Sequence, residues 1–159
     1  MKTTGARVLV CALSVLAPLM TATSPAGAAT GCGPADRLAG AQTYVDALAD
    51  PSVAYDVPVA PNVVRFENGL QTGFSGDFMR AELAAHLQYG GITDISNQRW
   101  SGTGNLVRAI YDLDYGVGDL NIADATIDET FAFNSACEIQ RIDATFSVRP
   151  GSSLTGDEE

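Results

Sequence analysis

A carboxylate on an apolar strand face is the feature of this 159-residue sequence that most directly suggests chemistry. Residues 125–134 alternate in polarity, which places Glu129 on the same face as Ile127, Phe131 and Phe133. A carboxyl group buried among such neighbours has a raised pKa unless it is paired, and this suits general acid or base catalysis. We therefore predict a catalytic role for Glu129. The alternative is a glutamate near the strand end that bends to solvent or meets an arginine.

His86 is the second predicted catalytic residue, because it is the only histidine in the chain. It follows Met79 and Leu83 at helical spacing and lies at the edge of their apolar stripe. An imidazole in this position can transfer protons near neutral pH. A half-exposed histidine with a structural role is the alternative interpretation.

Four further residues are predicted to contact a ligand. Asn68 continues one face of a short strand, although an Asn-Gly pair is also a turn signal. The other three are aromatic residues that would form the wall of a pocket: Trp100, Tyr111 and Phe131. Core packing explains Trp100 and Tyr111 equally well.

The remaining charged residues of the strands are predicted to face solvent. Asp112 and Asp114 lie two residues apart on the polar side of their strand, as expected for a solvated edge. Arg141 and Asp143 are predicted to form an exposed ion pair. The predicted mature chain has no phosphate-binding loop, nucleophile elbow or metal-ligand spacing, so we predict no metal and no cofactor.

Two early helices and a short strand precede most of these residues. Apolar residues at helical spacing predict one helix over residues 36–49 and another from the cap at 75–77 to the glycines at 90–91. Between them, Val64 and Phe66 share one face of a short strand, and Arg65 shares the other face with Glu67.

The second half of the chain consists of predicted strands. They cover residues 92–100, 106–115, 125–134 and 138–148, with turns at 102–104, 116–122 and 134–136. Helices first and strands later predict an α+β fold, in which a curved antiparallel sheet packs against the N-terminal helices.

The first 28 residues have the features of a secretory signal peptide. Lys2 and Arg7 form a cationic head, residues 8–20 are apolar, and residues 26–28 (Ala-Gly-Ala) fit a peptidase site. The apolar stretch is shorter than the roughly 20 residues of a membrane-spanning helix. We predict a secreted, soluble domain over residues 29–149 and an acidic disordered tail over residues 150–159. A rival interpretation makes Cys32 a lipidated membrane anchor.

Removal of residues 1–28 removes two basic residues and no acidic residue, so the formal net charge changes from -10 to -12. Such a surface repels phosphate backbones and anionic lipids, and we predict neither nucleic acid nor membrane as a partner of the mature protein. Two cysteines remain in a compartment that permits disulfides. We predict that Cys32 and Cys137 pair with each other.

Three segments carry a resemblance to a known family: residues 44–49 (YVDALA), 63–69 (VVRFENG) and 139–143 (IQRID). Together with the order of elements over residues 35–149, they resemble an exported branch of the nuclear transport factor 2-like superfamily, related to SnoaL-like cyclases. The resemblance implies a cone-shaped fold with a mostly apolar pocket on the inner face of the sheet. Its members include isomerases, polyketide cyclases, dehydratases and epoxide hydrolases, as well as non-catalytic binding and assembly modules.

The resemblance also argues against one activity. The epoxide hydrolases of the superfamily depend on an arginine between two aspartates at inward strand positions. The predicted inward positions Tyr111, Leu113, Ile142 and Ala144 carry no such residue.

Two functions therefore stay open. The first is a non-catalytic exported module that binds a small hydrophobic ligand or a protein partner in or around the cone. The second is a cofactor-independent isomerase, cyclase or lyase in which Glu129 and His86 transfer protons. The outer face of the sheet could also pair two protomers in a homodimer.

Overall fold

A computed structural model describes residues 31–155, so the predicted signal peptide lies outside the described residues. The helices of the first half are α1 Pro34–Ala49, the 3-10 helix η1 Pro51–Asp56 and α2 Gly76–Ala85. The strands are β1 Val59–Glu67, β2 Leu70–Gly73, β3 Ile92–Thr103, β4 Leu106–Val117, β5 Leu120–Phe133 and β6 Ile139–Pro150, followed by the short helix α3 Ser152–Thr155. This order confirms the predicted α+β class.

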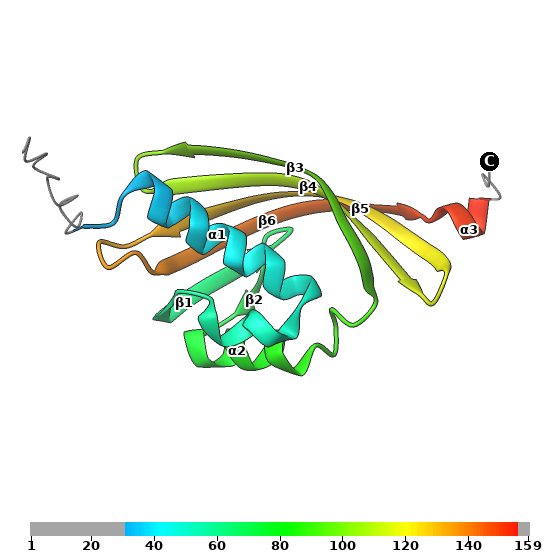
Figure 1. Ribbon diagram of the computed structural model, residues 1–159, viewed down its shortest axis with the longest axis horizontal. Coiled ribbons are helices and arrows are strands. Elements are labelled where there is room, and N and C mark those ends of the chain that lie inside the picture. Colours follow the sequence, from blue (N-terminus) through cyan, green and yellow to red (C-terminus); the bar gives the residue numbers. More distant parts are fainter. Residues whose placement is uncertain (1–30, 156–159) are drawn as a thin grey trace, which may run out of the picture.

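The six strands form one curved, open sheet in the order β2-β1-β6-β5-β4-β3. Helices α1 and α2 lie on its concave side (Figure 1). Neighbouring strands are antiparallel except for β1 and β6, which are parallel. The predicted curved sheet against N-terminal helices is confirmed, with the correction that the sheet is mixed. The reason is that the first and last long strands lie side by side and run in the same direction.

Helix α1 forms as its sequence pattern predicts. Pro34 occupies the first turn, where its missing N–H costs nothing, and the Gly33 amide donates to Asp36 Oδ2 at 2.9 Å. The apolar stripe, which includes Ala41 and Val45, is buried in the core. The helix ends before Pro51, which begins η1.

Helix α2 is shorter than predicted. Its beginning is as expected, since the Ser75 hydroxyl accepts a hydrogen bond from the Phe78 amide at 3.3 Å. His86 then adopts a left-handed conformation (φ 53°) and ends the helix. Leu87 is 90% exposed, and Tyr89 packs into the core instead. The prediction of a helix reaching residues 90–91 is therefore wrong, because the chain turns at His86.

Strand β1 turns the side of Arg65 to the core, and not the side of Val64 and Phe66 that the predicted ligand contact of Asn68 implies. Val63 and Arg65 point into the core, and Arg65 is only 1% exposed. Phe66 is half-buried on the outer side, where the Arg141 guanidinium stacks 4.4 Å from its ring centroid. This contact covers the outer apolar side chain and lets an arginine take the inner position.

Strands β4 and β5 continue through most of the turn predicted at residues 116–122. Only Gly118 and Asp119 separate them, and Gly118 has the positive φ (60°) that a tight hairpin turn requires. The long hairpin extends beyond α1 and α2 (Figure 1). Its apolar side chains there, including Tyr115 and Leu120, are exposed.

Both ends of the described chain are attached to the sheet. A disulfide joins Cys32 to Cys137, as predicted, and links the start of α1 to the turn between β5 and β6. At the other end, where the sequence predicts a tail from residue 150, the Gly151 amide donates to Ile122 O at 2.9 Å and α3 follows. Within residues 31–155, no helix is long and apolar enough to cross a membrane.

Candidate functional site

A pocket of about 260 Å³ lies between the concave face of the sheet and the helices. Helix α1, the segment after α2, and the inward positions of β4, β5 and β6 supply most of its walls. The lining residues are Tyr44, Leu48, Glu67, Gln88, Tyr89, Ile92, Tyr111, Leu113, Tyr115, Ala123, Asp124, Ala125, Ile127, Glu129, Ala144, Phe146 and Val148. Most of them are apolar or aromatic, as expected of a small-molecule site.

Three polar side chains of the pocket lie at its deep end, and several of its exposed lining residues are apolar. Glu129, Tyr111 and Tyr44 are each almost completely buried. By contrast, Phe146 and Val148 on the outer part of β6 are substantially exposed. A ligand in this pocket can therefore contact exposed apolar side chains at one end and the buried carboxyl group of Glu129 at the other.

Glu129 and Tyr111 are in direct contact at the deep end. The Tyr111 hydroxyl donates to Glu129 Oε2 at 3.0 Å. Glu129 is 3% exposed, and burial raises its pKa to about 8, against the lowering effects of Tyr111 and Arg65. Burial likewise raises the pKa of Tyr111, and the nearby Glu129 adds to this effect. At neutral pH Glu129 is therefore mostly a neutral acid, within a pH unit of its titration midpoint.

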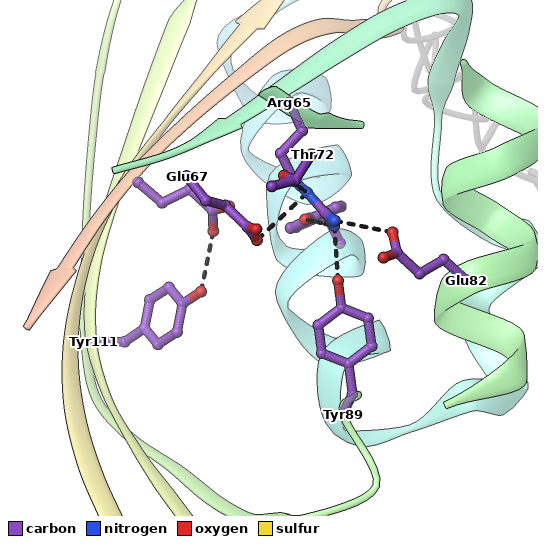
Figure 2. A network of polar contacts seen from close by, with 8 residues as sticks. Arg65, Glu67, Thr72, Glu82, Tyr89 and Tyr111 are labelled. Carbon is purple, nitrogen blue, oxygen red and sulfur yellow. Dashed lines mark hydrogen bonds and ion pairs between the residues drawn. The ribbon is translucent and has the colours of Figure 1, made fainter. Parts of the chain in front are cut away.

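A buried arginine, Arg65, lies next to the pocket and was not predicted from the sequence. Arg65 Nη2 lies 2.9 Å from Glu82 Oε2, and its Nε lies 3.4 Å from Glu67 Oε1. Its Nη1 donates to two tyrosine hydroxyls, Tyr89 at 2.7 Å and Tyr44 at 3.2 Å. Figure 2 shows Arg65 between Tyr89 and Glu82 on one side and Tyr111 on the other.

The sequence around Arg65 gives only an ambiguous signal. Val63 and Val64 are consecutive and both apolar, so either face of β1 could be assigned to the core. The predicted inward positions on β4 and β6 carry no arginine, and the buried arginine lies on β1, which that prediction did not cover. The partners of Arg65 are glutamates, tyrosines and Thr72, however, and not a pair of aspartates.

The predicted site residues divide into two groups. The structure brings Glu129 and Tyr111 together in the pocket. Phe131 packs beside them in the core, with its ring edge-on to Tyr44 at a centroid distance of 5.4 Å. Phe131 therefore contacts Tyr44, which lines the pocket, but does not line the pocket itself.

His86, Asn68 and Trp100 lie outside the pocket lining. His86 ends α2, and its Nε2 lies 3.0 Å from Leu48 O. Asn68 sits in the β1–β2 turn, where its side chain exchanges hydrogen bonds with the backbone of Phe146 at 3.2 and 2.9 Å. Trp100 lines a separate groove between α1 and the β3–β4 turn. The structure therefore does not bring His86 to Glu129.

Three aspartates of the strands, Asp112, Asp128 and Asp143, lie on the polar sides of their strands, as the alternation predicts, whereas Asp124 lines the pocket. Asp112 accepts hydrogen bonds from Asn97 and Thr126, which hold its pKa below its usual range. Asp128 pairs with Arg108, and Asp143 pairs with Arg141 two residues away on the same strand. In the described chain, no three His, Cys, Asp or Glu residues are arranged to hold a metal ion.

One family model matches the chain. It is described as "Domain of unknown function (DUF8021)" and matches residues 33–146. No curated protein matches the sequence.

Several solved structures share the fold. A protein of the SnoaL-like family from Agrobacterium tumefaciens has 21% identity and a TM-score of 0.53, covering 71% of this chain and 98% of its own. An LEH-like epoxide hydrolase from M. tuberculosis has 15% identity and a TM-score of 0.59, with coverages of 71% and 84%. An NTF2-like protein of unknown function from Cytophaga hutchinsonii has 14% identity and a TM-score of 0.54, with coverages of 71% and 97%. These similarities confirm the predicted nuclear transport factor 2-like fold.

Proposed function

We propose that this chain, which belongs to the DUF8021 family of domains of unknown function, binds a small and mainly apolar molecule in the pocket between α1 and the sheet. The observation that carries the proposal is one cavity with apolar walls and a buried carboxyl group at its deep end. Apolar walls provide the binding free energy, and a few buried polar groups orient the ligand.

A pocket-filling substitution tests this proposal. Ala123 lines the pocket and is only half-buried, so Ala123→Phe should fill part of the cavity with little strain on the core. We expect the variant to bind the neutral dye Nile red about 10-fold more weakly than the wild type, a loss of about 1.4 kcal/mol. Fluorescence titration measures both affinities.

Thr145→Phe is the matched control, because Thr145 is exposed on the outer face of β6. It adds the same aromatic ring without touching the pocket. The proposal fails if Ala123→Phe binds the dye as tightly as Thr145→Phe does.

Proton-transfer catalysis is the second candidate function, and the pKa of Glu129 near 8 favours it. General acids and bases work best when their pKa lies close to the operating pH. Glu129 would exchange the proton with a hydrophobic substrate, and the Tyr111 hydroxyl would orient the carboxyl group through its hydrogen bond. This corresponds to a cofactor-independent isomerase, cyclase or lyase without participation of His86.

Turnover of steroids and polyketides by the wild type and by Glu129→Gln tests the catalytic candidate. We expect Glu129→Gln to lower kcat by at least about 100-fold, because it removes the transferable proton and keeps the shape of the side chain. Mass spectrometry of the products measures the change. Binding without any turnover by the wild type would contradict catalysis and leave the binding function in place.

Export is part of the same proposal. The disulfide between Cys32 and Cys137 supports it, because structural disulfides persist mainly in oxidising compartments. The signal-like pattern of residues 1–28 points in the same direction.

A further inference from the structure

Apart from its tyrosines, the ionisable groups that line the pocket are all carboxyl groups. Glu67, Asp124 and Glu129 are its acidic lining residues, and no lysine, arginine or histidine of the described chain lines it. Gln88 and four tyrosines complete the polar lining, and the tyrosines are Tyr44, Tyr89, Tyr111 and Tyr115. The faces of such rings attract cations through their quadrupoles.

Within residues 31–155, no cation pairs with Glu129. The nearby Arg65 is held by other groups, because its Nη2 donates to Glu82, its Nη1 to the two tyrosines, and its Nε to Thr72. Two carboxylates, those of Glu67 and Glu82, already surround this single guanidinium (Figure 2). Arg65 is therefore fully compensated and does not line the pocket.

The second carboxyl oxygen of Glu129 is also unused. Oε2 accepts from Tyr111, whereas Oε1 has no hydrogen bond to any residue in the described part of the chain. Burying an ionised carboxyl group without a cation is costly, which is why burial raises the pKa of Glu129 so strongly. A group that brings a positive charge and hydrogen-bond donors to Oε1 would remove this cost.

We propose, on the basis of the binding function above, that the pocket selects a hydrophobic amine, with its ammonium group at Glu129 Oε1 and its apolar body along Leu113, Ile127 and Val148. The ammonium group supplies the missing cation and up to three donors. The apolar body covers the exposed side chains at the mouth. The net charge of -10 also favours the approach of cations.

Ligands with other head groups fit less well. A carboxylate head would lie beside the carboxyl groups of Glu67 and Glu129, and burying another carboxylate there without a cation in the lining is costly. An alcohol head can form a hydrogen bond with Glu129 but brings no charge. The proposal therefore ranks three ligands of equal chain length as amine, then alcohol, then carboxylate.

Isothermal titration of the disulfide-bonded protein with hexylamine, 1-hexanol and hexanoate tests this order. We expect the wild type to bind hexylamine about 10-fold more tightly than 1-hexanol, since a hydrogen bond to a charged group contributes about 1.5 kcal/mol or more. Hexanoate should bind more weakly than 1-hexanol. The preference for the amine should persist in 0.5 M salt, because a buried pair is screened less than surface charges are.

Two variants that each replace one carboxyl group by an amide identify the group responsible. Glu129→Gln should bring the affinity for hexylamine down to that for 1-hexanol, and should leave the affinity for 1-hexanol within about 2-fold. Asp46→Asn removes an exposed carboxylate of α1 and should change neither affinity.

The outcomes separate the two proposals. Equal affinities of the wild type for hexylamine and 1-hexanol overturn the selectivity for amines and leave the binding function intact. An equal loss of amine affinity in Asp46→Asn and in Glu129→Gln also overturns it, because the surface charge would then be the cause. If none of the three ligands binds, the binding function fails as well.

Discussion

Replacing Cys32 and Cys137 together with serine should lower the free energy of unfolding by about 4 to 5 kcal/mol. The disulfide joins residues 105 positions apart, so it closes nearly the whole described domain into one loop. In the chain-entropy model, a loop of this length removes much of the conformational freedom of the unfolded chain. Urea denaturation of the oxidised wild type and the double variant measures the difference.

The reduced wild type provides the control. In dithiothreitol it should unfold at the urea concentration at which the double variant unfolds, because both chains then lack the crosslink. Since domains of this size are typically stable by about 5 to 15 kcal/mol, the loss should be visible as a large shift. An unchanged midpoint of the wild type in dithiothreitol would contradict the stabilising role of the disulfide.

The inward position of Glu129 could be predicted because its strand alternates without interruption. Along β5, Ala125, Ile127 and Phe131 are buried with Glu129, and the polar residues between them face out. A long alternating strand has only one way to bury its apolar side. The disulfide was predictable for a similar reason, since only two cysteines remain once residues 1–28 are set aside.

The position of Arg65 could not be predicted from local sequence. Its strand carries apolar residues on both faces, so the local pattern does not say which face is buried. The outer Phe66 is covered by Arg141, which lies about 75 residues later in the sequence and comes close only in the folded chain. The parallel pairing of β1 with β6 has the same origin. Contacts between distant segments decide both features, and no local pattern encodes them.

The misplacement of His86 has a different cause. The predicted position of His86 assumes that the helix continues to residues 90–91, because Met79 and Leu83 recur at helical spacing. A single residue in the left-handed conformation ends α2 at His86 and rotates everything after it. Tyr89 thereby reaches Arg65, and Leu87 turns to solvent.

Arg65 is buried and donates hydrogen bonds to two of the tyrosines that line the pocket. We expect Arg65→Met to lower the free energy of unfolding by about 3 kcal/mol. The substitution keeps most of the apolar stem but removes the guanidinium from Glu82 and from the hydroxyls of Tyr44 and Tyr89. Removing one partner of a buried ion pair typically costs about 3 to 5 kcal/mol, and the partial exposure of Glu82 favours the lower end.

Arg108→Met isolates the contribution of burial in this comparison. Arg108 also pairs with a carboxylate, that of Asp128, but it is about half exposed where Arg65 is 1% exposed. Exposed ion pairs contribute about 0 to 1 kcal/mol, so urea denaturation should show a loss at Arg108 no larger than this. The two variants remove the same cation and introduce the same side chain, and they differ chiefly in the solvent around the pair. If both lose the same stability, the cluster around Arg65 does not hold β1, α1 and α2 together as its hydrogen bonds indicate.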